Sequence, residues 1–243
     1  MWRNKIVSVI FPTYNEKESI REAIEDFFSS GYVDEIVVVN NNAIHGTDDE
    51  VKKTKARLVH EKKQGYGYAI QKGIEEAKGE IFVISEPDGT FVGRDIIKLL
   101  SYSDDFDYVL GTRTTRELIW EGANMGRFLK WGNWAVAKMM EFLFNCTTLT
   151  DVGCTMRLIK RNAYDKIKDK FSIGGSHFGP EMTLLIITNN IKFVEVPLNY
   201  GKRIGKSSVT GSKFVAFLLG LKMIWLIIKF WFRWIMGKRS FKD

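Results

Sequence analysis

The sequence predicts an α/β fold with a mostly parallel sheet and flanking helices. In the first half of the chain, short apolar runs alternate with segments of helical periodicity, which is typical of a parallel sheet. One run, EIVVVN at 35–40, is centred on consecutive apolar β-branched residues, as in a strand buried on both faces. The chain has 243 residues, of which 45% are hydrophobic, enough to bury a sizeable core.

The predicted elements follow in chain order. Strands are predicted at 5–11, 35–40, 57–60, 80–85 and 107–111, and helices at about 15–30, 66–77 and 94–100. Asn15, with Glu18 three residues further on, predicts a capping box at the start of the first helix. After Gly111 the alternation stops, and the predicted elements are a helix at 125–144, strands at 154–160 and 192–198, a helix at 180–189 and an apolar helix at 214–236.

The positive charge of the chain is concentrated in its tail. From Lys202 onward there are ten Lys or Arg and one acid, a net charge of +9, so the rest of a chain with net charge +7 carries −2. A nucleic-acid-binding protein would more usually carry basic residues on its folded face, so we expect no nucleic-acid partner. A basic tail of this kind instead favours a membrane surface.

Two further features indicate the cytoplasm. Cys146 and Cys154 match no disulfide framework and no paired metal-ligand motif, which is typical of reduced thiols. The first apolar run, Ile6 to Pro12, is too short for a signal peptide and is expected to be a strand.

Polar side chains follow four of the predicted strands, at the point where each strand ends. They are Thr13–Glu16, Asn40–Asn42, Glu86–Asp88 and Thr112–Arg113. In an open α/β sheet, ligands bind beyond the carboxyl ends of the strands, so these four clusters predict one site. Glu86 and Asp88 are two residues apart and can hold a divalent ion together with a diphosphate, because Mg²⁺ and Mn²⁺ prefer oxygen ligands.

Seven stretches of the sequence carry a resemblance to a known family. They are PTYNE (12–16), VVNNNAIHGT (38–47), QGYGYAIQKGIEEAKG (64–79), EPDGTF (86–91), GTR (111–113), DVGCTMRLIKR (151–161) and EVPLNYGKRIGKSS (195–208). In this order they resemble family 2 glycosyltransferases of the GT-A fold, the fold of nucleotide-diphospho-sugar transferases. The branch that they resemble includes dolichol-phosphate mannose synthase and related polyprenyl-phosphate hexose synthases.

The resemblance implies a role for each matching residue. The nucleotide-binding residues would be Pro12, Tyr14, Glu16, Asn41, Gly65, Glu86 and Asp88, with Mg²⁺ or Mn²⁺ held by Glu86 and Asp88. The acceptor phosphate would be bound by Arg113, Arg157, Arg203 and Lys206, and the residues expected to carry catalysis are Asp88, Arg113, Arg203 and Lys206. Two positions depart from the family pattern: Asn40-Asn41 replaces the more usual Asp-Asp, and Glu86 replaces the first Asp of the metal motif.

The reaction implied is the inverting transfer of a hexose, mannose or glucose, from a nucleotide diphosphate sugar to a polyprenyl or dolichyl phosphate. A phosphate acceptor needs no general base, because its second pKa is about 6. The first alternative is a lipid or saccharide hydroxyl acceptor, for which His177, near Glu181, is the best candidate base. The second alternative is a non-catalytic membrane-bound scaffold that has kept the fold.

A polyprenyl acceptor requires contact with a membrane, and two segments are candidates. Six of the seven tryptophans lie in 120–134 and 225–234, and the expected membrane contacts are Trp131, Trp134, Lys222, Trp225, Lys229, Trp231, Arg233 and Trp234. At about 100° per residue, the three basic residues of the terminal helix fall within about 20° of one line. This pattern favours an amphipathic helix in the interface at the cytoplasmic face, with a single membrane span as the alternative.

The sequence thus predicts two parts. Residues 1–211 form the transferase domain, including a candidate interface helix at 125–144, and residues 212–243 form a basic membrane-interface helix. A second copy of the chain or a membrane partner subunit remains open as a further partner.

Overall fold

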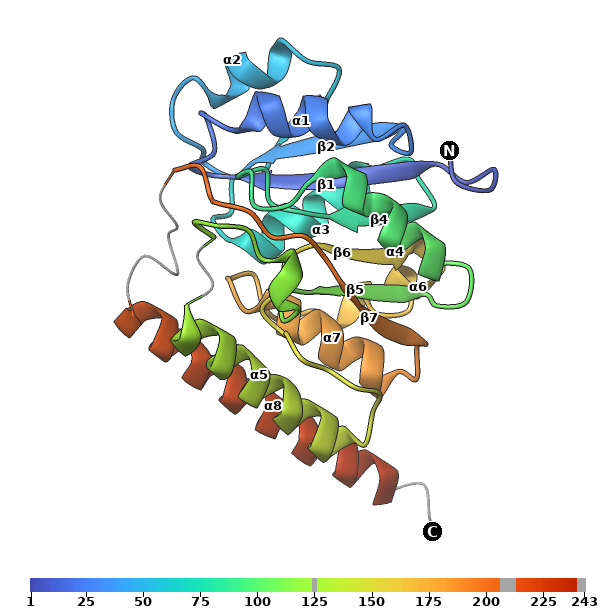
Figure 1. The fold of residues 1–243 in the computed structure, drawn as a ribbon. Helices are drawn as coiled ribbons and strands as arrows, with labels where there is room; N and C mark the ends of the chain where they lie inside the picture. The colour runs from blue at the N-terminus through green and yellow to red at the C-terminus, as the bar shows by residue number, and fades with distance from the viewer. Residues whose placement is uncertain (124–125, 206–212, 240–243) are drawn as a thin grey trace.

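The computed structural model describes residues 1–123, 126–205 and 213–239, and it confirms an α/β fold with a mostly parallel sheet (Figure 1). The strands are β1 Val7–Thr13, β2 Glu35–Asn40, β3 Arg57–His60, β4 Ile81–Ile84, β5 Tyr108–Thr112, β6 Arg157–Lys160 and β7 Phe193–Pro197. They form one sheet in the order β3-β2-β1-β4-β6-β5-β7. Only β6 runs against its neighbours: it pairs antiparallel with both β4 and β5.

The helices agree with the predicted pattern except where they are very short. They are α1 Ile20–Ser29, α2 Thr47–Lys52, α3 Tyr66–Glu76, α4 Ile96–Tyr102, α5 Arg127–Phe144, α6 Arg161–Asp165, α7 Phe178–Thr188 and α8 Lys213–Arg239, with 3-10 turns at Gly93–Asp95, Arg116–Leu118 and Lys168–Lys170. The helices α2 and α6 were not predicted, because five or six residues are too few to show a helical period.

The predicted capping box is wrong. The helix α1 begins at Ile20 with Ser19 as its N-cap residue, and no side chain caps it. The reason is that Glu16 takes the backbone donors upstream: its Oε2 accepts hydrogen bonds from the backbone N–H groups of Tyr14 (2.7 Å) and Asn15 (2.8 Å). These bonds hold the end of β1 in a turn and delay the start of the helix.

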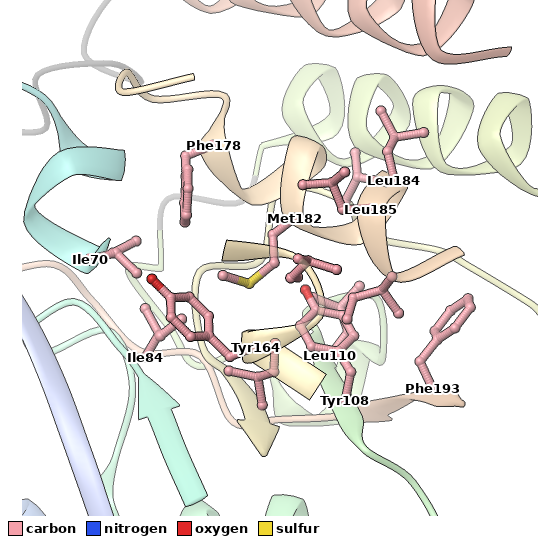
Figure 2. Packing of buried hydrophobic residues seen from close by; sticks show 14 of the residues in the cluster. Ile70, Ile84, Tyr108, Leu110, Tyr164, Phe178, Met182, Leu184, Leu185 and Phe193 are labelled. Carbon is pink, nitrogen blue, oxygen red and sulfur yellow. The ribbon is translucent and has the colours of Figure 1, made fainter. Parts of the chain in front are cut away.

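Alternate residues of the strands point to opposite faces of the sheet and build two cores. On one face, side chains such as Val9 and Phe11 pack with α1 and α4. On the other face, Ile84, Tyr108 and Leu110 pack with α3, α6 and α7; Figure 2 shows this second core closely filled.

A further layer of helices lies outside α7. The helix α8 runs alongside α5, and both pack on α7 (Figure 1). One face of α8 is buried through Met223, Leu226 and Ile227, and the rings of Phe144 on α5 and Trp234 on α8 lie 5.5 Å apart. The two helices therefore form a slab across one end of the domain.

Candidate active site

The carboxyl ends of the parallel strands open onto one cavity of about 800 Å³. All four predicted strand ends reach it. The lining residues are Thr13, Tyr14 and Glu16 after β1, Asn41 after β2, Glu86 after β4 and Arg113 after β5. Because β6 is antiparallel, its first residue, Arg157, reaches the same edge, opposite Ile84 in the register.

Three carboxylates converge on Arg203 at the polar end. Its Nη1 lies 3.1 Å from Glu86 Oε2 and 2.7 Å from Asp88 Oδ2, and its Nη2 lies 3.1 Å from Glu16 Oε1. Burial, and then the charge of Asp88, raise the pKa of Glu86 to about 8. One guanidinium therefore does not neutralise this cluster, and the site favours an additional cation.

The chemistry of this cluster fits a divalent metal ion. No group of three or more His, Cys, Asp or Glu in the described residues is arranged to hold a metal by itself. Mg²⁺ and Mn²⁺ are usually held by one or two carboxylates together with substrate phosphates, so Glu86 and Asp88 suffice if a diphosphate supplies the rest. Asp88 is fully buried, and its Oδ1 is fixed by the backbone N–H of Thr90 (2.9 Å) while Oδ2 faces Arg203. A metal at these oxygens and Arg203 would compete for the same positions.

Asn41 has a structural task that explains why it is not an aspartate. It is 3% exposed, and its Nδ2 donates to the carbonyls of Glu61 (2.9 Å) and Lys63 (2.8 Å). Its Oδ1 accepts from the backbone N–H of Gly65 at 2.7 Å. A carboxylate could not donate to these two carbonyls, so the amide is what fixes the loop that leads into α3.

Gly65 is required by the close approach of two backbones. Its φ is 151°, and a Cβ at this position would collide with the carbonyl oxygen of Gly174. Gly65 therefore allows the start of α3 to pack against the loop before α7.

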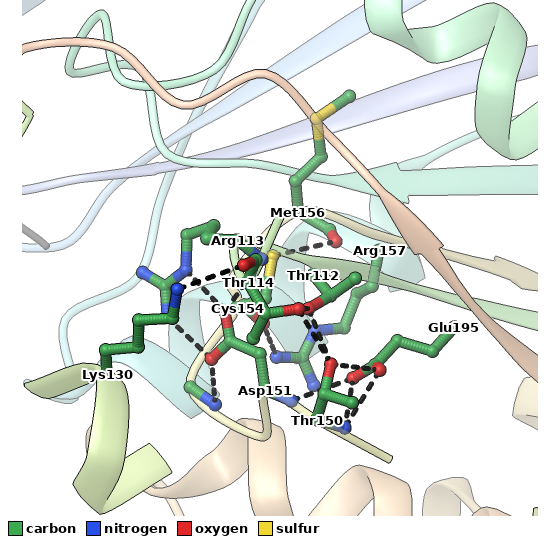
Figure 3. Close-up of polar contacts among 11 residues, drawn as sticks. Thr112, Arg113, Thr114, Lys130, Thr150, Asp151, Cys154, Met156, Arg157 and Glu195 are labelled. Atoms are coloured by element: carbon green, nitrogen blue, oxygen red, sulfur yellow. Dashed lines mark hydrogen bonds and ion pairs between the residues drawn. The ribbon is translucent and has the colours of Figure 1, made fainter. Parts of the chain in front are cut away.

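Arg113 is held by a buried bidentate pair (Figure 3). Its Nε lies 2.7 Å from Asp151 Oδ2 and its Nη2 lies 2.9 Å from Oδ1. Glu195, on β7, in turn accepts from the backbone N–H groups of Thr150 (2.8 Å) and Asp151 (2.9 Å). Sequence reasoning did not predict Asp151 or Glu195 as parts of the site, although both lie in the stretches that carry the resemblance.

Arg157 is a buried cation with no acid partner among the described residues. It is 3% exposed and donates to the hydroxyl of Tyr108 (3.0 Å) and to the carbonyls of Gly179 (2.9 Å) and Cys154. All three acceptors are neutral, whereas Arg113 and Arg203 face carboxylates. Of the cavity-lining arginines in the described residues, Arg157 alone keeps an uncompensated charge. Lys206, the fourth predicted phosphate ligand, lies outside the described residues.

The far end of the cavity is apolar and lies between α5 and α8. Its walls are Leu129, Gly132, Ala135 and Val136 of α5 and Ala216, Phe217, Leu219, Gly220, Leu221, Met223 and Ile224 of α8. A Cβ added at Gly132 or Gly220 would meet no atom within 4 Å. These two glycines therefore leave open the space between the helices.

None of the three histidines lines the cavity as far as the described residues define it. Glu181, the proposed partner of His177, has its carboxylate occupied by the backbone N–H (2.9 Å) and hydroxyl (2.5 Å) of Ser172 and by the backbone N–H of Ile173 (2.9 Å). The fold therefore uses Glu181 to anchor the loop before α7.

The fold and the site define a nucleotide-sugar transferase of the GT-A type, and comparison with known proteins agrees. Residues 8–168 match the model of glycosyl transferase family 2. The chain belongs to this family, as the resemblance predicted.

Relatives of the chain are named for transfer to lipid phosphates. A dolichyl-phosphate hexose transferase of Haloferax volcanii is 28% identical over 84% of this chain and 86% of its own length. A UDP-N-acetylglucosamine–dolichyl-phosphate N-acetylglucosaminyltransferase of Methanococcus voltae is 24% identical over 90% and 97%. A dolichol-phosphate mannosyltransferase of Pyrococcus furiosus is 26% identical over 87% of this chain, which spans 61% of that relative.

Solved structures confirm the fold. Glucosyl-3-phosphoglycerate synthase from Mycobacterium tuberculosis, in complex with Mn²⁺, UDP and phosphoglyceric acid, superposes with a TM-score of 0.72 at 15% identity, covering 94% of this chain and 79% of that one. The same enzyme has also been solved with Mg²⁺ and UDP, with a TM-score of 0.67, 15% identity and coverage of 89% and 79%.

Proposed function

We propose that the protein transfers a hexose from a nucleotide diphosphate sugar to a polyprenyl phosphate, at the cytoplasmic face of a membrane. One observation carries this proposal: a single cavity joins a charged end, suited to phosphates, to an apolar end between α5 and α8, suited to a hydrocarbon chain. The names of the relatives, which include dolichyl-phosphate hexose and mannosyl transferases, support the same substrates.

The donor is assigned to the polar end. Pro12, Tyr14, Glu16 and Asn41 would surround the nucleoside. Glu86, together with the buried Asp88 that shares Arg203 with it, would hold Mg²⁺ or Mn²⁺. When bound, the metal would stabilise the charge that develops on the leaving nucleoside diphosphate. Arg203, once a cation takes its place at the carboxylates, is free to contact phosphate oxygens, which is the role that we propose for it.

The acceptor phosphate is assigned to the middle of the cavity, near Arg157. One of its oxygens attacks the anomeric carbon, a new carbon–oxygen bond forms, and the bond to the diphosphate oxygen breaks with its electron pair. This single displacement inverts the anomeric centre. Because the phosphate is already mostly dianionic at neutral pH, the protein does not have to remove a proton from it. The described lining of the cavity contains no histidine, which agrees with this mechanism.

The helix α8 is proposed to lie in the membrane interface, as expected for the segment 212–243; the predicted boundary at 211/212 itself lies outside the described residues. Among the described residues, Phe214–Gly237 is long and apolar enough to cross a membrane, with a mean hydropathy of 1.9, and 17% of its most apolar window is buried. Its exposed apolar side chains are Phe214, Val215, Phe217, Leu218, Leu221, Trp225, Phe232 and Met236. Lys222, Lys229 and Arg233 are exposed too, so an interfacial position lets them meet anionic headgroups.

The helix α5 adds to the same surface. Trp131 is 64% exposed and Trp134 is 40% exposed, with their rings 5.5 Å apart. Trp231 and Trp234 of α8 are half-buried and pack against the core, so they would contact lipid with only part of their surface.

Radiolabelled transfer tests the proposal. Membrane extracts of the expressed chain, supplied with labelled GDP-, UDP- or dTDP-sugars, Mn²⁺ and a polyprenyl phosphate, should yield a labelled lipid that mild acid cleaves. A labelled lipid that resists mild acid would identify a hydroxyl acceptor instead. Binding of a nucleotide sugar without transfer to any acceptor would identify the non-catalytic scaffold.

A further inference from the structure

One residue that lines the cavity, Tyr66, carries a buried hydroxyl with no hydrogen-bond partner in the described part of the chain. Tyr66 is the first residue of α3, and its ring packs against the core while the residue lines the cavity. Buried side-chain polar atoms without a hydrogen-bond partner in the described part of the chain occur in Trp2, Tyr66, Ser85 and Asp88. Of these four residues, only Tyr66 lines the cavity. A buried hydroxyl without a partner costs free energy, so its retention at this place indicates a ligand.

The charged groups near Tyr66 indicate what kind of ligand its hydroxyl would bind. Arg157 is among the charged groups that act on the Tyr66 hydroxyl. Arg157 is buried among neutral acceptors, and burial raises the pKa of the neighbouring Cys154 thiol to about 12, so this thiol is not a counter-ion. Burial likewise raises the pKa of Tyr66 well above its ordinary value, which keeps its proton available for donation. A buried cation and a free donor on residues that line the same cavity are complementary to an anion.

Glu86 and Asp88, which also act on Tyr66, do not supply that anion. Both carboxylates are engaged by Arg203, with Asp88 Oδ2 at 2.7 Å and Glu86 Oε2 at 3.1 Å from its Nη1. The anion must therefore come from a substrate, and phosphate is the anionic group that the proposed reaction brings into the cavity.

We propose that the Tyr66 hydroxyl and the Arg157 guanidinium together bind a phosphate group of a substrate, with Tyr66 as the hydrogen-bond donor. The inference rests on the proposed function for the identity of that substrate. Either the donor diphosphate or the acceptor monophosphate can supply the oxygen, and the experiment distinguishes the two.

The variant Tyr66→Phe removes only the hydroxyl. Since this hydroxyl has no protein partner in the described structure, the melting temperature of the free protein should stay unchanged or rise. Binding is then measured by calorimetry with three probes: UDP with Mn²⁺, GDP with Mn²⁺, and geranyl phosphate. A hydrogen bond to a charged group corresponds to roughly ten- to a hundredfold in affinity, and we expect a loss of this size for one class of probe.

The class of probe identifies the source of the phosphate. A loss confined to the nucleoside diphosphates assigns Tyr66 to the donor, and a loss confined to geranyl phosphate assigns it to the acceptor. The matched control is Tyr68→Phe, two residues further along α3, because Tyr68 does not line the cavity. This control should bind all probes as the wild type does.

Two results would overturn the inference alone, and a third would overturn the proposed function with it. If Tyr66→Phe binds every probe as tightly as the wild type, the hydroxyl contacts no phosphate. If it melts several degrees lower than the wild type without ligand, the hydroxyl has a partner in the protein. If the wild-type chain itself binds none of the probes, the proposed function fails along with this inference, so the two failures can be told apart.

Discussion

The two ends of the cavity are built in opposite ways. The polar end is formed by short segments that leave the strands, and its side chains are charged, buried and bonded to one another, as in the contacts of Arg203 with Glu86 and Asp88. The apolar end is formed by the long helices α5 and α8, and there Gly132 and Gly220 leave space unfilled. The first end is suited to the charged groups of the proposed donor and the second to the hydrocarbon of the proposed acceptor, so the two substrates would meet within one cavity.

The largest effect that separates the two ends is expected from Asp88→Asn. Loss of one carboxylate of the proposed metal-binding pair should lower the rate of transfer by about a thousandfold, because stabilisation of developing charge commonly contributes more to catalysis than any other effect. Binding of a prenyl phosphate, at the other end, should stay the same. Steady-state kinetics and calorimetry on the same preparation provide the comparison, and unchanged turnover would exclude Asp88 from the metal site.

The charge of α8 should matter for the membrane and not for the chemistry. Each basic residue near an anionic surface contributes about 1 kcal/mol, so changing Lys222, Lys229 and Arg233 together to Gln should weaken binding to anionic vesicles by about 3 kcal/mol, over a hundredfold. Transfer to a soluble short-chain acceptor should be unaffected. A membrane span predicts the reverse, since removal of three charges would strengthen insertion, and extraction with alkaline carbonate would then fail.

Filling the apolar end should impair the long acceptor selectively. Gly220→Phe places a ring where a side chain meets no atom within 4 Å, so the helix should fold normally while the space between α5 and α8 is lost. We expect kcat/KM for a long-chain polyprenyl phosphate to fall by about tenfold or more, the equivalent of about two buried methylene contacts. The control is Gly237→Phe on the same helix. A Cβ at Gly237 also meets no atom within 4 Å, but Gly237 does not line the cavity. Equal effects of the two substitutions would contradict the assignment.

The smallest expected effect concerns the contact between the core and α8. Burial, and then the charge of Lys222 on α8, lower the pKa of His177 below its ordinary value, while Glu181 on α7 acts in the opposite direction. The unfolded chain therefore takes up a proton more readily than the folded chain, and stability is lost as the pH falls below about 6.5. His177→Gln should flatten the dependence of the melting temperature on pH between about 7 and about 5. An identical slope in wild type and variant would show that His177 does not titrate against α8.

The contrast between the two ends also shows what can be predicted from sequence. The polar end was predictable because strands of a parallel sheet bring their ends to one edge, so the positions of Glu16, Asn41, Glu86 and Arg113 followed from the order of the elements. Arg157 reaches that edge only because β6 is antiparallel, which its four residues do not reveal. The pairing of Arg203 with the carboxylates joins residues more than a hundred positions apart and has no local signal.

The apolar end could not be predicted for a related reason. The sequence predicts α5 and α8 as separate helices, but the space between them depends on how the two pack side by side, and a glycine in a helix looks merely unfavourable when it is read alone. Tyr66 lies between two glycines, and nothing in the sequence marks its hydroxyl as important. Its importance rests on a missing hydrogen bond, which only a structure can show.

The central claim is that the acceptor places its hydrocarbon chain in the apolar end while its phosphate faces the donor, and photo-crosslinking tests it most directly. A polyprenyl phosphate with a diazirine in its second isoprene unit is irradiated with the membrane-bound protein, and the labelled peptides are identified by mass spectrometry. The account predicts adducts within α5 and α8, suppressed by an excess of unmodified polyprenyl phosphate. Adducts confined to other elements, or adducts that polyprenyl phosphate does not suppress, would contradict it.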